Sequence, residues 1–289
     1  MQNAFLPATS ASDLVCPVCQ LPLAKGSRTY TCQKGHSFDR AREGYVNLLI
    51  RQTKGIHGDN RAMLTARRDF LDKGYYAMLS AALAESLVSR LHDGAHLLDA
   101  GCGEGYYSAK IMERAEQDGK HLHLLGIDIS KEALRLADKR QKNAEWAVGS
   151  LYDLPVRRAS QDAITCLFAP LSIGEFHRTL KPNGILAVAV PDARHLFGLK
   201  CLLYDTPYEN EVRDEKIEGF VCEEVLTLAD QIRLTSQADI QALFTMTPYA
   251  YRTSAEGRRR LSLCTELETE ICFKLFLYRR DDSCPSLDK

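Results

Sequence analysis

The sequence predicts an α/β fold in which a doubly wound parallel sheet follows a small N-terminal module that is stabilised by a metal ion. Three observations lead to this prediction. From Gly94 onward, short apolar runs alternate with helical segments, as in consecutive βαβ units. A glycine-rich bend joins the first of these runs to a helix. Three cysteines and a histidine gather in a turn-rich stretch near the N-terminus.

Composition and charge set the class of protein. The chain of 289 residues is 45% hydrophobic and 26% charged, which suits one large and one small folded domain. A net charge of -1 excludes nucleic-acid binding through uniform basicity, so such binding needs a local patch. The opening residues carry no secretory signal, and no apolar run approaches the roughly 20 residues of a membrane span. We therefore expect a cytoplasmic protein with no membrane partner and with reduced cysteines.

The sequence divides into four parts. Residues 1–14 are polar, show no periodicity and are predicted to form a flexible tail. Residues 15–45 form the metal-binding module. Residues 46–92 combine a glycine-containing linker with helices that are broken near Gly74, and residues 93–289 form the main domain.

The main domain is predicted to alternate strands and helices. Right-handed crossovers between its strands would place them parallel in one sheet. The predicted elements begin with a strand over 96–100, a helix starting at Tyr107, a strand over 123–129 and a helix starting at Lys131. They continue with strands over 145–148 and 162–168, a helix ending at 176–180, a turn at 181–184 and a strand over 185–190.

The metal site is predicted from Cys16, Cys19, Cys32 and His36, which follow the pattern C-x2-C-x12-C-x3-H. A C-x2-C turn places two thiolates within reach of one ion, and the second pair completes a tetrahedral shell typical of zinc. Such a closed shell leaves no position for water, so the zinc would be structural and would stabilise a segment too short to bury a core. A redox CxxC pair and coincidental cysteines are the alternatives, which the shared turn-rich segment disfavours.

The glycine-rich bend is the candidate cofactor loop. It follows Asp99 and turns on Gly101, Gly103 and Gly105 before a helix begins. Glycine allows the dihedrals of a tight bend and lets the backbone approach a ligand closely. Asp128 ends the next strand 23 residues beyond Gly105, where a carboxylate can chelate two ribose hydroxyls. On these residues alone, a nicotinamide site, a purely structural turn and a methyl-donor site remain open.

Two local motifs favour the methyl donor. The run DAGCGEG over 99–105 resembles motif I of S-adenosylmethionine (SAM) methyltransferases, in which the first acidic residue addresses the amino-acid end of the cofactor. The run GSLYDLP over 149–155 resembles the segment that meets the adenine in those enzymes, which implies contacts from the backbone of Ser150 and Leu151. The resemblance implies a class I, Rossmann-like methyltransferase domain.

Longer segments resemble one family of these enzymes. They are CPVC at 16–19, HSFDRAREGYVNLL at 36–49, AMLTARRDFLDKGYY at 62–76 and PDARHLFGLK at 191–200. Together they resemble the 23S rRNA (guanine-N1)-methyltransferases that act on hairpin 35, and the likeness runs from Cys16 almost to the C-terminus. Ordinary methyltransferases lack both the CPVC knuckle and the RRDFLDKGYY segment.

The family resemblance implies specific roles. Tyr76, Gly103, Glu104 and His195 are expected to contact SAM, in addition to the residues that the general fold suggests. Cys16, Cys19, Cys32 and His36 are expected to hold zinc. The resemblance also implies a homodimer whose subunits form a cleft for the 23S rRNA hairpin.

A basic segment supports an RNA substrate. Between Lys25 and Lys73 there are eleven Lys and Arg residues against five Asp and Glu residues. The alternative is a merely solvated face. We expect Arg67 and Arg68 to bind RNA without affecting the cofactor. Within the module, the residues expected to stack on bases or pair with phosphates are Tyr30, Lys34, Phe38, Arg40 and Arg42.

The reaction chemistry suggests candidates but no catalytic base. Guanine N1 bears a proton that must leave as the methyl group arrives, and Asp192 and His195 follow a strand at the carboxyl edge of the sheet, where either could assist. Phe168, Tyr249 and Tyr251 are candidates for stacking an unstacked base, and each also fits an ordinary core aromatic.

Two other functions compete with rRNA methylation. The first is a small-molecule SAM methyltransferase in which the zinc module serves as a lid, which the basic segment disfavours. The second is a non-catalytic zinc and RNA-binding protein with a degenerate cofactor site. The intact run of Asp99, Gly101, Gly103, Glu104 and Gly105 disfavours the second.

Overall fold

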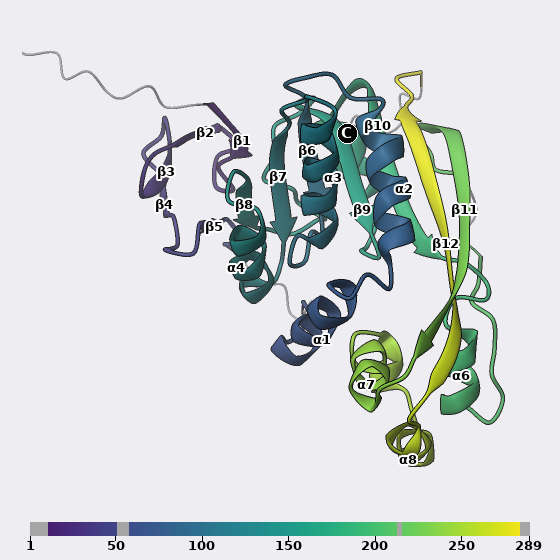
Figure 1. Cartoon of the computed structure of the whole chain (residues 1–289). Coiled ribbons are helices and arrows are strands. Elements are labelled where there is room, and N and C mark those ends of the chain that lie inside the picture. Colours follow the sequence, from purple (N-terminus) through teal and green to yellow (C-terminus); the bar gives the residue numbers. More distant parts are fainter. Residues whose placement is uncertain (1–10, 51–57, 213–215, 284–289) are drawn as a thin grey trace, which may run out of the picture.

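Two sheets form the framework of the chain in the computed structural model, which describes residues 11–50, 58–212 and 216–283 (Figure 1). An antiparallel sheet of four strands holds the N-terminal module, and a mixed sheet of eight strands forms the main domain. Among the described helices, none is both long enough and apolar enough to cross a membrane.

The N-terminal sheet is a meander in the order β1-β2-β3-β4. Its strands span Ala11–Val15, Pro22–Lys25, Thr29–Cys32 and Ser37–Asp39. The prediction of a tail over residues 1–14 is wrong from Ala11 onward, because β1 pairs with β2. Leu14 is fully buried and bridges Val156 of the main domain. A long-range contact therefore makes this segment a strand, whereas residues 1–10 lie outside the described residues.

The large sheet has the order β11-β12-β10-β9-β6-β7-β8-β5. Its strands are β5 (Tyr45–Asn47), β6 (His96–Ala100), β7 (His123–Asp128), β8 (Glu145–Val148), β9 (Gln161–Leu167), β10 (Leu180–Pro191), β11 (Phe220–Leu234) and β12 (Leu267–Arg280). The six strands from β5 to β10 pair in parallel, which confirms the predicted α/β alternation. The strand β12 pairs antiparallel with β10, and β11 pairs antiparallel with β12, a feature that the sequence did not predict.

Two predicted connections turn out to be strand. Tyr45–Asn47, at the predicted boundary between module and linker, forms β5 and pairs in parallel with β8. The predicted turn at 181–184 lies within β10, where the pairing with β9 shifts register between Leu180 and Ile185. Asn183 adopts a left-handed conformation there, with φ 59°. The strand is therefore irregular at the predicted turn, because its pairing with β9 stops after Leu180 and resumes at Ile185.

The predicted helices are present, and three further helices follow the last predicted strand. The predicted ones are α1 (Arg61–Leu71), α2 (Ala77–Val88), α3 (Tyr106–Gln117), α4 (Lys131–Arg140) and α5 (Ile173–Thr179), and the further ones are α6 (Phe197–Leu203), α7 (Gln237–Thr245) and α8 (Ala255–Leu263). The predicted break near Gly74 is confirmed, since Gly74 has φ 80° between α1 and α2. The predicted starts of α3 and α4 agree with the structure to within one residue.

The core has one apolar cluster on each face of the large sheet, because side chains alternate along a strand. Leu97 belongs to the cluster beneath α2 and α3, which pack against each other. Leu98 points the other way, into a cluster that also contains Phe176 of α5 and Tyr30 of the N-terminal module. The N-terminal module is thus packed onto the large sheet rather than joined to it by a linker alone.

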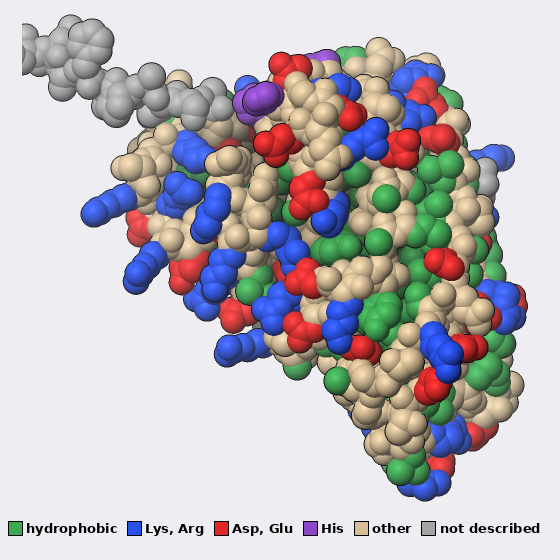
Figure 2. All heavy atoms as spheres, in the orientation of Figure 1, with side chains coloured by type: hydrophobic (Ala, Val, Ile, Leu, Met, Phe, Trp, Pro, Cys, Tyr) green, Lys and Arg blue, Asp and Glu red, His purple; other side chains and the backbone are tan. Residues whose placement is uncertain are grey.

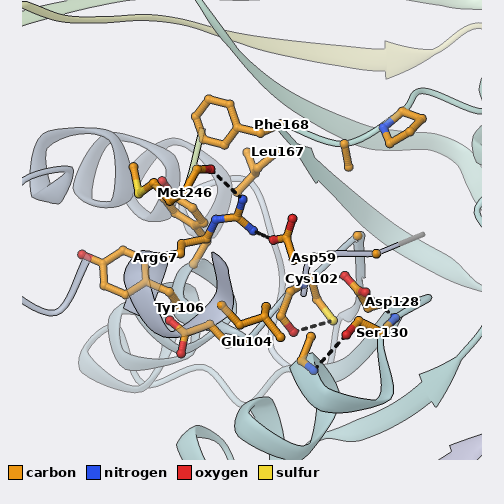
Figure 3. A pocket seen from close by; sticks show the side chains of 18 of the residues that line it. Asp59, Arg67, Cys102, Glu104, Tyr106, Asp128, Ser130, Leu167, Phe168 and Met246 are labelled. Carbon is orange, nitrogen blue, oxygen red and sulfur yellow. Dashed lines mark hydrogen bonds and ion pairs between the residues drawn. The ribbon is translucent and has the colours of Figure 1, made fainter. Parts of the chain in front are cut away.

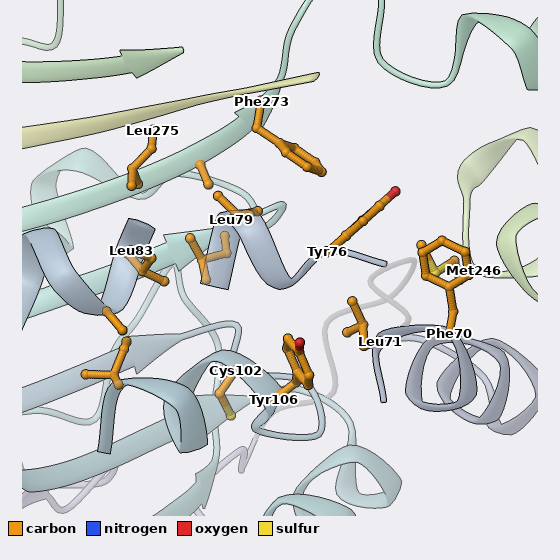
Figure 4. Packing of buried hydrophobic residues seen from close by; sticks show 14 of the residues in the cluster. Phe70, Leu71, Tyr76, Leu79, Leu83, Cys102, Tyr106, Met246, Phe273 and Leu275 are labelled. Atoms are coloured by element: carbon orange, nitrogen blue, oxygen red, sulfur yellow. The ribbon is translucent and has the colours of Figure 1, made fainter. Parts of the chain in front are cut away.

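The helix α2 places one site residue. Its sequence AMLSAALAESLV is largely apolar, and its own residues Leu79 and Leu83 are fully buried. Tyr76 precedes its first turn and packs edge-on against Phe70 and Phe273 (Figure 4). This packing holds Tyr76 at the carboxyl ends of the strands, where ligands bind in such folds.

Candidate cofactor cavity and zinc centre

The zinc ligands come from two short turns. Cys16 O accepts a hydrogen bond of 2.8 Å from Gln20 N, and Cys32 N donates one of 3.0 Å to His36 O. Each turn therefore presents two ligand side chains on the same side. The four ligand atoms of Cys16, Cys19, Cys32 and His36 all lie within 4.8 Å of one another.

The distances between these atoms fit a tetrahedral ion. The sulfurs of Cys19 and Cys32 are 3.7 Å apart, and Nδ1 of His36 lies 3.4 Å from the sulfurs of Cys16 and Cys32. With Zn–S bonds of about 2.3 Å, tetrahedral geometry places two sulfurs about 3.8 Å apart. The predicted Cys3His set is thus assembled, and it fits a closed, structural zinc site.

The zinc module also carries exposed positive charge. Arg28, Lys34 and Arg42 are exposed, and Figure 2 shows Lys and Arg side chains gathered over this end of the molecule. The predicted role of Tyr30 in base stacking is wrong, because its side chain is 1% exposed and belongs to the core. Phe38 is half-buried against the same cluster. The module therefore presents a basic face rather than a row of free aromatics.

The glycine loop between β6 and α3 needs each glycine for a different reason. Gly101, Gly103 and Gly105 all have positive φ, at 79°, 54° and 77°. A Cβ on Gly101 would lie 2.6 Å from that of Ala169, so the two backbones approach closely. A Cβ on Gly103 would meet nothing within 4 Å, since this glycine borders open space. Gly105 instead faces Trp146, which a Cβ would approach to 3.3 Å.

A cavity of about 710 Å³ opens beside this loop, at the carboxyl ends of the parallel strands (Figure 3). Its size is in the range of small-molecule and cofactor sites. Nine of the ten predicted cofactor residues line it: Tyr76, Asp99, Gly101, Gly103, Glu104, Asp128, Ser150, Leu151 and His195. The tenth, Gly105, does not line the cavity, because it packs against α4 and β8.

Asp128 forms hydrogen bonds with two segments of the cavity wall. Its carboxylate accepts hydrogen bonds from the backbone N–H of Gly103 at 2.9 Å and of Ser130 at 2.8 Å. Burial raises the pKa of this carboxyl, while these two bonds lower it. Each carboxylate oxygen keeps a further lone pair, so Asp128 can still accept from two hydroxyls.

Asp99 lies deeper in the wall and is 3% exposed. It accepts hydrogen bonds from the hydroxyls of Ser108 on α3 and Thr165 on β9, the latter at 2.9 Å. Burial raises the pKa of Asp99 to about 6 against the effect of these bonds. The side chain is thereby fixed between the strand and the helix that carry the glycine loop.

Glu104 is held by an ion pair. Its carboxylate accepts bonds of 3.0 and 3.1 Å from Arg140 of α4, which also pairs with Asp72 after α1 at 2.9 Å. Glu104 is only 3% exposed, and this burial raises its pKa, while the pairing with Arg140 opposes the rise. The pair joins the glycine loop to both helices.

His195 and Tyr76 form a buried pair at the end of the cavity. The Nδ1 atom of His195 accepts a bond of 3.2 Å from Cys272 N, so its proton sits on Nε2 and donates to the Tyr76 hydroxyl, 3.3 Å away. Burial, helped by the charge of Lys200, lowers the pKa of His195 to about 3. His195 is therefore a neutral hydrogen-bond donor and a poor base near neutral pH. Of the two candidate bases, Asp192 does not line the cavity.

This neutral histidine predicts a pH dependence of stability. The pKa of His195 falls from 6.5 in the unfolded chain to about 3 in the folded protein, so only the unfolded chain binds its proton between these values. Stability is therefore lost as pH falls through this window. Between about pH 6 and pH 4, the wild-type free energy of unfolding should fall relative to that of His195→Gln by about 1.4 kcal/mol per pH unit. Urea unfolding measures both curves, and parallel curves would contradict the buried neutral state.

Of the three aromatic candidates for stacking on a base, two line the cavity and one does not. Phe168 and Tyr249 line the cavity, and Phe168 is 46% exposed with a left-handed φ of 56°. Tyr251 does not line it; its hydroxyl accepts a bond of 3.2 Å from Asn60 on the outer surface. Phe168 and Tyr249 therefore remain candidates for contacting a base, and Tyr251 does not.

Arg67 lies where the sequence did not place it. We expected it on an RNA-binding surface, yet its side chain lines the cavity and pairs with Asp59. Arg68, its neighbour, points elsewhere and pairs with Asp69. The signal was helical spacing, because position 67 follows buried Leu64 by three residues and precedes buried Leu71 by four.

Comparisons with known proteins agree with this geometry. The chain matches a family model described as RlmA, N-terminal, over residues 14–55 and a methyltransferase domain model over residues 91–243. It is 37% identical over 238 residues to the 23S rRNA (guanine(748)-N(1))-methyltransferase of Streptomyces fradiae, which covers 80% of this chain and 81% of that protein. It is 31% identical over 264 residues to YxjB of Bacillus subtilis (strain 168), provisionally named as an enzyme of the same kind, covering 88% and 91%.

These similarities extend well beyond the methyltransferase domain, which matches over residues 91–243 alone. The predicted fold, family and cofactor classes are confirmed. The chain therefore belongs to the 23S rRNA (guanine-N1)-methyltransferase family, in which a SAM-dependent class I methyltransferase domain follows a zinc ribbon.

Proposed function

We propose that the chain transfers the methyl group of SAM to N1 of a guanine in the hairpin 35 loop of 23S rRNA. The similarity to the Streptomyces fradiae enzyme, over 80% of this chain, is the observation that carries the proposal. The resemblance of the CPVC and RRDFLDKGYY segments to enzymes of hairpin 35 supports the location. The homodimer that the same resemblance implies is part of this proposal.

The cavity suits SAM part by part. Asp128, with two lone pairs free, would accept the ribose hydroxyls, and the backbone at Ser150 and Leu151 would border the adenine. The open space over Gly103 leaves room for the cofactor to cross the loop. The Tyr76 hydroxyl oxygen would accept a hydrogen bond from His195 Nε2–H and would direct its own O–H toward the ligand. When bound, SAM supplies an electrophilic methyl group on a sulfonium.

The reaction replaces the N1 proton of guanine by this methyl group. In this transfer the N1–methyl bond would form as the sulfur–methyl bond of SAM breaks, which would leave a neutral thioether, and the N1 proton would pass to solvent. His195, with a pKa of about 3, is too weak a base to accept that proton near neutral pH. We infer that the chain accelerates the transfer chiefly by positioning the two reactants in line.

The target guanine must leave its stack to reach the cavity. Phe168 offers it an aromatic surface at the carboxyl end of β9, where its ring is 46% exposed. Its left-handed backbone is a strained conformation that persists only where surrounding structure imposes it. We infer that this strain turns the Phe168 ring toward the incoming base.

Mapping of the modified position tests the proposal. Unmodified 23S rRNA and its hairpin 35 fragment are incubated with the protein and SAM, and primer extension then locates stops, because N1-methylguanine blocks base pairing. A stop at one guanine of the loop is the expected result. The matched control is a fragment with adenine in place of the loop guanines, which should give no stop. Stops outside the hairpin, or methylation of small molecules alone, would overturn the proposal.

The basic face of the zinc module predicts a salt-dependent RNA affinity. Replacing Arg28, Lys34 and Arg42 together by alanine should weaken RNA binding and lower the slope of log affinity against log salt by about 2 to 3 units. Lys110→Ala is the control variant, because this side chain of α3 is 42% exposed and lies outside the module. Filter binding over a salt series measures both. An unchanged slope would show that RNA contacts another surface.

A further inference from the structure

Arg67 of α1 is the one Lys or Arg side chain that lines the cavity in the described part of the chain. Figure 3 shows it between Asp59 and Met246, and the dashed lines mark its two bonds. The Asp59 carboxylate accepts from Nη1, and the Met246 carbonyl accepts from Nη2 at 3.3 Å. These bonds join the segment before α1, α1 itself and the end of α7. Arg67 is therefore anchored from two sides within the cavity.

Most of the hydrogen-bonding capacity of Arg67 remains unused. A guanidinium carries five N–H donors in one plane, and these two contacts take only part of them. The side chain is 32% exposed, so its remaining donors can meet a ligand. Such a planar fork matches the two oxygens of a carboxylate.

The other charged side chains of the cavity indicate which part of SAM lies near Arg67. Asp99, Glu104 and Asp128 are acidic, and they suit the ammonium and hydroxyl groups of the cofactor. The methionine end of SAM also carries a carboxylate, which needs a cationic partner. Arg67 lies close enough to act on Asp128, since its charge opposes the rise that burial and the charge of Asp59 cause in the pKa of Asp128.

We propose that Arg67 binds the α-carboxylate of SAM, and that Asp59 and the Met246 carbonyl hold the guanidinium in place for this contact. The assignment rests on the proposed function only in that SAM is the cofactor. It makes Arg67 a ligand-binding residue of the cavity rather than part of the RNA surface.

Two ligands and two variants test the assignment by calorimetry on the full chain. The ligands are SAM and its decarboxylated analogue, which lacks only this carboxylate. Arg67→Met should weaken SAM binding about 10- to 100-fold, the loss expected for a charge-assisted hydrogen bond. The analogue should bind Arg67→Met as well as it binds the wild type. Arg68→Met, one residue along the same helix, should change neither affinity.

Three outcomes would overturn the assignment. These are equal losses for both ligands, no loss for SAM, or a loss of RNA affinity with SAM binding intact. The last would return Arg67 to the RNA surface. If Arg67→Met fails to fold, Arg67→Lys is measured with the same ligands and should keep part of the preference for SAM. A chain that binds SAM but does not methylate 23S rRNA would still show this preference, so failure of the proposed function is distinguishable.

Discussion

Replacing Cys32 by serine is expected to release the zinc and unfold the N-terminal module. Cys32 supplies one of four ligand atoms and lies 3.7 Å from the sulfur of Cys19. A structural zinc contributes on the order of 10 kcal/mol to the folding of such a module. Because strands β1 to β4 are short, their sheet is not expected to persist without the metal. Metal analysis after dialysis against a chelator should find about one zinc per wild-type chain and almost none in the variant.

The effect on activity should separate the two domains. The Cys32→Ser variant should lose most rRNA methylation, since the basic face belongs to the module, yet should still bind S-adenosylhomocysteine in the cavity. Cys201→Ser is the matched control, because Cys201 is an exposed thiol outside the cluster. Full metal content in the Cys32→Ser variant would show that this cysteine is not a ligand.

Removing the Asp128 carboxylate should be the most damaging single change in the cavity. It accepts from the backbone of Gly103 and Ser130, and it is the proposed partner of both ribose hydroxyls. Two hydrogen bonds to a charged group are together worth about 3 to 6 kcal/mol. Asp128→Ala should therefore weaken S-adenosylhomocysteine binding by about 100-fold or more in calorimetry.

Two further variants make the Asp128 measurement specific. Asp128→Asn keeps the shape and one acceptor oxygen, so its loss of affinity should be smaller. Asp118→Ala removes an exposed aspartate at the end of α3 opposite the glycine loop, and it should leave the affinity for S-adenosylhomocysteine unchanged. Wild-type affinity in Asp128→Ala would mean that the ribose is held by other groups, and it would weaken the cofactor interpretation of the whole cavity.

Features that depend on short spacing along the chain can be predicted from the sequence. The zinc ligands lie in pairs within two turns, so their order along the chain almost fixes their geometry. The glycine loop and Asp128 sit at the ends of consecutive parallel strands, and the topology of such strands brings these ends to one edge. The α/β alternation between residues 96 and 190 could also be predicted, because these strands and helices differ in the period of their apolar residues.

Features that depend on distant partners appear only in the folded chain. Ala11–Val15 and Tyr45–Asn47 are strands because β2 and β8 pair with them, and no local pattern marks either one. Arg67 enters the cavity because of the side of α1 that packs inward. His195 loses its basicity because it is buried beside Lys200. Long-range pairing and desolvation depend on which segments meet, and a sequence read one segment at a time does not contain that information.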